Sequence, residues 1–207
     1  MSIPGKSVVV VRGSLAAGSA IINVTTPLIV VGRNSALLTP SPGLDGLTIT
    51  SGDITLRNLT IRGSASPATG LGIKASPDGG SSVTLRLDTC AVIENPGGGI
   101  LLNGAGFEIR NTTVSNNKAG TLGLGTFGGI LVNEPPAAGP AILANVTIQN
   151  NEQVGLVCSG AIPATSSVLS SGNVSEMPNP SNQISSTCGI SPCTSASPTC
   201  GAQSSPQ

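Results

Sequence analysis

Apolar residues in this chain recur at every second position within short segments, and Gly and Asn residues separate these segments. Such alternation over roughly four to eight residues predicts β-strands that turn one face toward a core. Residues 46–61 and 99–114 align without a gap, and their apolar positions coincide. Helices are disfavoured because the chain is rich in Gly, Pro, Thr and Val and shows no 3.6-residue period.

A repeat organises these strands along the chain. Gly followed by Ile or Leu opens a strand at Gly72, Gly99, Gly129 and Gly155, with spacings of 27, 30 and 26 residues. Repeats of this length, built from short strands, predict a β-solenoid whose successive coils stack on one another. A column of Asn residues precedes another strand of the repeat, and we expect its side chains to form a structural ladder of stacked amides in a turn. This column consists of Asn58, Asn111 and Asn145.

The Asn column and the Gly-Ile strand starts resemble those of the right-handed parallel β-helix proteins, the pectin-lyase-like group. The resemblance covers residues 46–160 clearly and residues 8–38 weakly. It implies an all-β fold, a single-stranded right-handed parallel β-helix, in which each coil adds one strand to each of three stacked sheets. We expect residues 1–175 to form this β-helix and residues 176–207 to form an irregular tail rich in Ser, Pro and Cys. The resemblance leaves activity open, because this fold hosts lyases, hydrolases, adhesins and non-catalytic modules.

Composition narrows the function classes. The 207 residues include no His, Trp or Tyr, and charged residues make up 9% of the chain, with nine basic and nine acidic side chains. Without His, a Ser-His-Asp site and imidazole metal ligands are excluded. A net charge of zero argues against a nucleic-acid partner. We expect no cofactor and no metal, and no apolar run is long enough for a membrane span.

Alternation also predicts which side chains face outward, where chemistry would take place. On the sheet that follows the Gly-Ile starts, the outward positions hold no carboxylate, and Lys74 alone cannot serve a glycosidase or a lyase. On the next sheet, Arg57, Asp88 and Arg110 alternate in sign on successive coils, which is typical of compensating ion pairs. These three residues are also the weak alternative set for catalysis.

One outward file of side chains on the Gly-Ile sheet is apolar and lies beside a polar file. We expect it either to bind a partner or polymer, or to be covered by a loop or by the C-terminal tail. The segment from Thr121 to Phe127 reads as a short insertion that forms a lid or contact loop. The predicted binding residues are Leu101, Leu131, Val157, Asn103 and Asn133.

The five Cys residues fall into two groups. Cys90 and Cys158 lie in apolar strand-like segments and read as small buried hydrophobic residues. Cys188, Cys193 and Cys200 lie in the Ser- and Pro-rich tail, where disulfides are the first interpretation and free thiols the second. Their spacing matches no zinc pattern.

Together these features predict a non-catalytic β-helix module with a structural or binding role toward a polysaccharide or another protein. The alternative is a carbohydrate-active enzyme, a polysaccharide lyase or a glycoside hydrolase. The composition suggests an extracellular or cell-surface location. Because residues 1–6 do not form a signal peptide, we expect the leader to be absent from this sequence.

Overall fold

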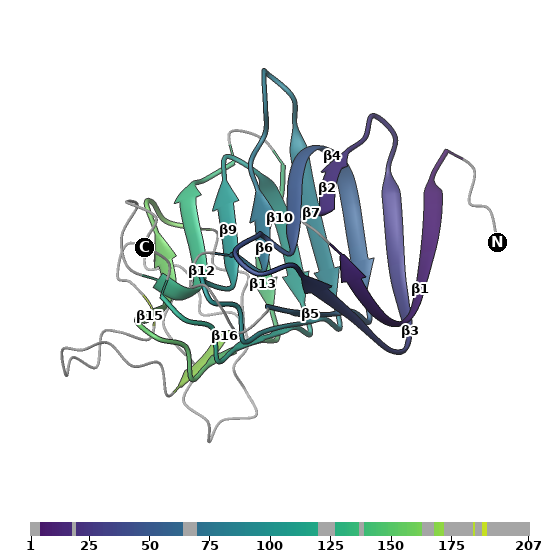
Figure 1. Ribbon diagram of the computed structural model, residues 1–207. Helices are drawn as coiled ribbons and strands as arrows, with labels where there is room; N and C mark the ends of the chain where they lie inside the picture. Colours follow the sequence, from purple (N-terminus) through teal and green to yellow (C-terminus); the bar gives the residue numbers. More distant parts are fainter. Residues whose placement is uncertain are drawn as a thin grey trace.

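The computed structural model describes residues 5–17, 20–63, 70–119, 127–136, 139–162, 168–171, 184 and 188–189. Short strands lie side by side along one axis, from β1 at the N-terminal end to β15 and β16 at the other end (Figure 1). Each strand pairs in parallel with the equivalent strand of the next coil. The predicted parallel β-helix is therefore confirmed.

The coils have three faces, and single strands of the first coils turn the corners between faces. The first face contains β2 (Ala20–Asn23), the first half of β4 (Leu47–Arg57), β6 (Ile73–Ala75), β9 (Ile100–Asn103), β12 (Phe127–Glu134) and β15 (Val154–Cys158). The second face contains the first halves of β1 (Ser7–Ala17) and β3 (Leu28–Pro40), the second half of β4, β7 (Val83–Asp88), β10 (Gly106–Arg110) and β13 (Ala141–Ala144). The third face contains the second halves of β1 and β3, β5 (Thr60–Arg62), β8 (Ala91–Ile93), β11 (Thr113–Ser115), β14 (Val146–Gln149) and β16 (Val168–Ser171).

The core is a set of aliphatic columns that run along the axis. On the third face, Ile61, Val92, Val114 and Ile148 are register partners on successive coils and are fully buried. Each such side chain contributes roughly 1.5–3 kcal/mol on burial. Phe107 is the aromatic member of this core and is also fully buried.

The predicted Asn column lies in the corner between the second and third faces. Asn58, Asn111 and Asn145 have φ angles of 53°, 48° and 54°, a left-handed conformation that Asn tolerates better than most residues. The Asn145 amide donates to Asn111 Oδ1 at 2.9 Å, and the Asn111 amide donates to Asp88 Oδ1 at 3.1 Å. All three Asn residues are exposed, so this column lies in a turn at the surface.

A second ladder of amides is buried between the third and first faces. It consists of Asn95, Asn117 and Asn151, each exposed by 1% or less. The Nδ2 groups of Asn95 and Asn117 each donate to the Oδ1 atom of the next rung at 2.8 Å. The backbone N–H groups of the same two residues donate to the same Oδ1 atoms at 3.0 Å. This ladder satisfies the buried turn groups and fixes the spacing of the coils.

The last coil is joined to a distant part of the chain. Cys158 forms a disulfide with Cys188, and Ile184 forms a parallel bridge with Leu156. The disulfide prediction is confirmed for Cys188, but the expectation that Cys158 is merely a buried hydrophobic residue is wrong. Its partner lies beyond the repeat, where the alternation pattern gives no information about contacts. Cys193 and Cys200 lie outside the described residues.

Cys90 is the free, buried thiol that the sequence predicts. Desolvation by burial raises the pKa of this thiol above its usual value. The thiolate is the reactive form, so Cys90 is chemically protected in the folded protein. The predicted domain boundary at residue 175 stays a prediction, because residues 172–183 lie outside the described part of the chain.

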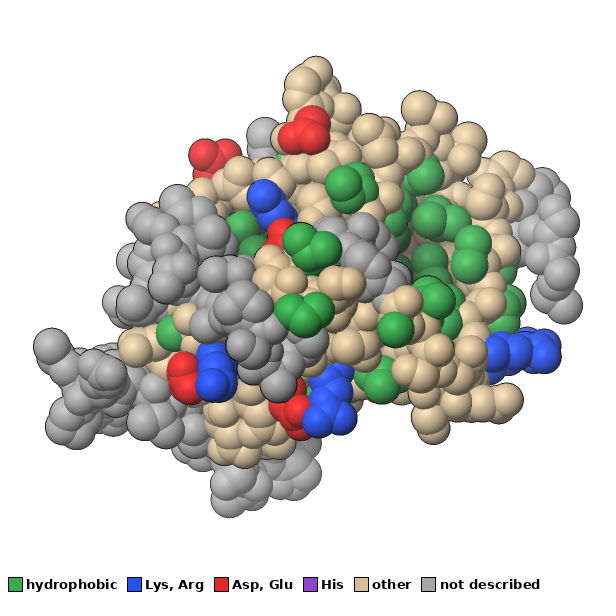
Figure 2. Space-filling view, viewed as in Figure 1, with side chains coloured by type: hydrophobic (Ala, Val, Ile, Leu, Met, Phe, Trp, Pro, Cys, Tyr) green, Lys and Arg blue, Asp and Glu red, His purple; other side chains and the backbone are tan. Residues whose placement is uncertain are grey.

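The N-terminal end of the solenoid is open. Val9 and Leu15 pair in register with Val30 and Leu38 of the next coil, yet they are 47% and 46% exposed. Figure 2 shows hydrophobic side chains gathered at this end of the molecule. Interior columns that are closed elsewhere therefore reach solvent here.

The buried amide ladder leads to a first prediction. Replacing Asn117 by Ala orphans the donors of Asn95 and the acceptor of Asn151, and each orphaned buried group costs roughly 1–3 kcal/mol. We expect Asn117→Ala to lower the free energy of unfolding in urea by about 3 kcal/mol or more. The control is Asn133→Ala, which removes one amide bond at a half-buried position and should cost less than about 1 kcal/mol. Equal losses in the two variants would contradict the role of the buried ladder.

The disulfide leads to a second prediction. It closes a separation of 30 residues, and bridges of this size stabilise by about 3–4 kcal/mol. Cys188→Ala should lose about this much stability in urea unfolding, and a reductant should destabilise the unmodified protein but not the variant. Unchanged stability of the unmodified protein in reductant would show that the bridge is absent.

Candidate functional site

A charged groove of about 320 Å³ lies on the second face. β4, β7 and β10 supply its charged side chains because their outward positions stack in register on successive coils. It contains four basic and three acidic side chains, with Thr55 between them. The full lining is Lys6, Ile29, Asp53, Thr55, Arg57, Arg86, Leu87, Asp88, Glu108 and Arg110.

Ion pairs connect the charges of this groove across the coils. Arg57 Nε lies 3.8 Å from Asp88 Oδ2, and Arg86 Nε lies 3.4 Å from Glu108 Oε1. Arg86 also contacts Asp53 through its Nη1 atom. Every acidic side chain of the groove thus has an arginine partner.

The groove brings together the three residues of the weak catalytic set. Arg57 and Arg110 are register partners of Asp88 from its two neighbouring coils. Arg110 turns instead toward Glu108 of its own strand, with Nε 3.5 Å from Oε2. Asp88 thus pairs with Arg57 alone and accepts hydrogen bonds from Thr89 and Asn111. The side chains have the alternating order that the sequence predicts, with one partner exchanged.

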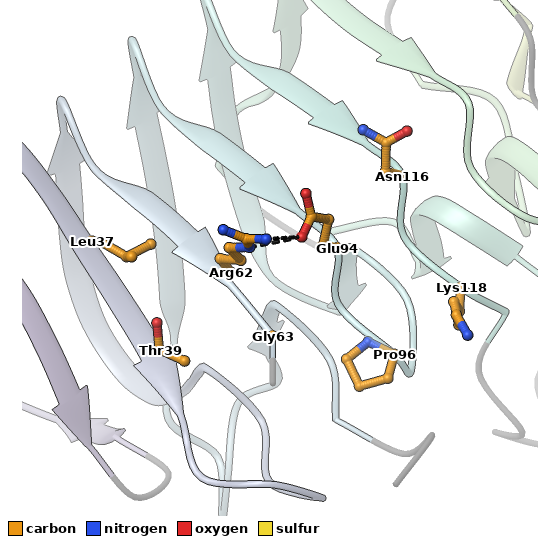
Figure 3. A pocket seen from close by; sticks show the side chains of 8 residues that line it. All are labelled: Leu37, Thr39, Arg62, Gly63, Glu94, Pro96, Asn116 and Lys118. Atoms are coloured by element: carbon orange, nitrogen blue, oxygen red, sulfur yellow. Dashed lines mark hydrogen bonds and ion pairs between the residues drawn. The ribbon is translucent and has the colours of Figure 1, made fainter. Parts of the chain in front are cut away.

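A second hollow of about 490 Å³ lies where the third face turns toward the first (Figure 3). In its centre Arg62 Nε donates to Glu94 Oε2 at 2.7 Å, with Lys118 and Pro96 on one side of this pair. Its lining residues are Leu37, Thr39, Arg62, Gly63, Glu94, Pro96, Asn116 and Lys118. The volume suits a small ligand.

Sequence reasoning missed this second hollow. Glu94 was expected in a turn, and Arg62 carried no prediction. In the register of β5 and β8, Arg62 pairs with Ile93, so Glu94 is displaced by one residue from its ion-pair partner. A comparison of repeats position by position therefore does not align the two charges.

The apolar file expected on the outside of the first face is covered. Leu101 and Leu131 are only 3% and 2% exposed, and Val157 is half-buried. Leu71 and Phe127 pack against them and form a small second hydrophobic cluster. The expectation that Leu101 and Leu131 are exposed is therefore wrong, and the alternative of internal cover is the one observed. Of the predicted insertion, Phe127 belongs to this cluster, whereas residues 120–126 lie outside the described part.

The polar file beside this cluster is half-buried. Asn133 Nδ2 donates to Asn103 Oδ1 at 2.7 Å, and Asn103 Nδ2 lies 3.3 Å from Ser76 Oγ. These amides bond to one another along the axis and leave little free capacity toward a ligand. Binding by Asn103 and Asn133 stays a prediction.

Two further features bear on possible chemistry. Within the described residues, no group of three or more Cys, Asp or Glu side chains is arranged to hold a metal ion. The same part of the chain contains no helix with the length and apolarity to cross a membrane.

Comparison with known proteins agrees with the geometry. A family model described as a right-handed β-helix region matches residues 45–191, which is more than half of the chain. Comparisons with curated proteins and with solved structures find no match. Both the stacked parallel coils and the family match therefore lead to one conclusion: this chain belongs to the right-handed β-helix family.

Proposed function

We propose that this chain is a non-catalytic module of a secreted or cell-surface protein, with a structural or binding role toward a polysaccharide or another protein. The observation that carries the proposal is the ion-paired groove on the second face. Its charges compensate one another across coils, and its guanidinium groups still reach solvent.

The energetics of the groove favour exchangeable binding. Arg57 and Asp88 are 54% and 40% exposed, and ion pairs at such exposure contribute only about 0–1 kcal/mol. A ligand carboxylate or hydroxyl can therefore replace Asp88 as the partner of Arg57 at little cost. Arginine forks suit this exchange because they present several donors in one plane.

The same pairs argue against catalysis. Glycoside hydrolysis uses two carboxyl groups that face the scissile bond with room for the sugar between them. Here Arg86 lies between Asp53 and Glu108 and contacts both. The guanidinium therefore occupies the space between the two carboxylates.

The extracellular part of the proposal is supported by the disulfide between Cys158 and Cys188. Such bonds persist mainly in oxidising compartments. A structural bridge at the end of a solenoid also suits a protein that works without the protection of the cytosol.

The alternative is a polysaccharide lyase or a glycoside hydrolase. The favouring observation is that Arg57, Asp88 and Arg110 line one groove of about 320 Å³. In this alternative, an arginine or a carboxylate acts as the acid or base on a bound sugar chain.

Incubation with acidic and neutral polysaccharides separates the two functions. With polygalacturonate, alginate and dextran as probes, we expect binding to at least one probe and no new reducing or unsaturated ends. Arg57→Ala should weaken that binding roughly tenfold, because it removes a charge-assisted hydrogen bond. Arg62→Ala is the matched control, since it removes an ion-paired arginine from the other hollow.

Two outcomes would count against the proposed module. New chain ends that vanish in Asp88→Ala would establish the enzyme. Equal loss of binding in Arg57→Ala and Arg62→Ala would place the ligand outside the groove.

A further inference from the structure

Strand β1 has a free edge at the open end of the solenoid. Within the part of the chain that the structure describes, β3 is the strand that pairs with it. The Ser7 N–H donates to the Pro27 carbonyl at 3.0 Å, so the backbone of Ser7 faces β3. Backbone groups of alternate residues point to opposite edges of a strand. The N–H and C=O groups of Val8 and Val10 therefore face away from β3, toward the free edge.

This edge lacks the features that usually keep strand edges from pairing. Natural proteins protect edges with Pro, inward charges, bulges or a covering segment. From Val8 to Val11 the strand holds four consecutive valines without Pro or charge. Val8, Val9 and Val10 are 37%, 47% and 46% exposed. Since Val9 lies in a core column, a strand added here would extend the core as well as the sheet.

The charge of this end selects the partner. The first acidic residue of the chain is Asp45, whereas Lys6, Arg12 and Arg33 precede it. Arg12 and Arg33 are exposed register partners on adjacent strands, an arrangement of like charges that is destabilising by itself. An acidic side chain beside Arg12 would relieve this repulsion.

A second copy of the chain does not fit this end. A head-to-head contact would bring two sets of Lys6, Arg12 and Arg33 together. A head-to-tail contact would require the other end, where Ile184 already bridges Leu156 and the disulfide holds Cys188 in place.

The geometry points to an extended acidic polypeptide strand of a partner protein as the occupant of this edge. The strand adds to the second face beside Ser7–Arg12 and pairs with the free backbone groups of Val8 and Val10. It places apolar side chains over Val9 and Asp or Glu side chains near Lys6 and Arg12. This surface is separate from the charged groove, so it does not depend on the proposed function.

A peptide-binding experiment with the full chain tests this inference. The probe is an acetylated and amidated peptide of alternating Glu and Val, and the matched probe has Lys in place of every Glu. Binding is measured by fluorescence polarisation, and the site is located by amide hydrogen exchange at Val8 and Val10. We expect the acidic peptide to bind at least tenfold more tightly than the basic one and to slow exchange of these two amides.

Two variants locate the interaction. Val10→Pro removes an N–H that faces the free edge, a position where Pro is tolerated, and should weaken binding at least tenfold. Val10→Thr keeps this N–H and is its matched control. Arg12→Glu should reverse the preference toward the basic peptide, and it serves as the variant of choice if Val10→Pro alters the melting temperature.

Several results would overturn the inference. These are equal affinity for the two peptides, unchanged exchange at Val8 and Val10 with bound peptide, or full binding by both Val10→Pro and Arg12→Glu. A dimer detected by light scattering and abolished by Val10→Pro would also overturn it, because the occupant would then be a second copy.

Discussion

Parallel, in-register hydrogen bonding between coils is the constraint on which this structure depends. It stacks each residue on the equivalent residue of the next coil at a spacing of ~4.8 Å. Columns must therefore contain side chains that tolerate their own kind: aliphatic on aliphatic in the core, and amide on amide in the buried turn. The Gly column obeys the same constraint, since a Cβ at Gly99 would lie 2.5 Å from the Gly129 carbonyl oxygen.

The same constraint shapes the surface and the two ends. Charges on the second face cannot avoid their register neighbours, so alternating signs neutralise one another and leave a groove of exchangeable pairs. At the C-terminal end a disulfide and a bridging residue cover the last coil. At the N-terminal end the stacking stops at β1, which leaves backbone groups and core valines open to solvent.

Sequence reasoning succeeded where a property follows from the repeat alone. The inward positions of Ile61 and Val114 and the outward order of Arg57 and Asp88 depend on alternation and register, which the aligned segments reveal. It failed for Leu131, because the cover comes from Phe127, which belongs to no repeated position. The amide of Asn117 was also missed, since only the stacked fold supplies partners that make a buried Asn stable.

Residue-resolved amide hydrogen exchange tests the stacking account most directly. The backbone N–H groups of Asn95 and Asn117 lie in turns but donate to buried Oδ1 atoms of the next coil. They should therefore exchange as slowly as the N–H of Ile73, which donates to the Gly99 carbonyl within the first face. Exchange of these two turn amides at the rate of the exposed turn around Gly79 would contradict the account, because the buried ladder would then not hold the coils together.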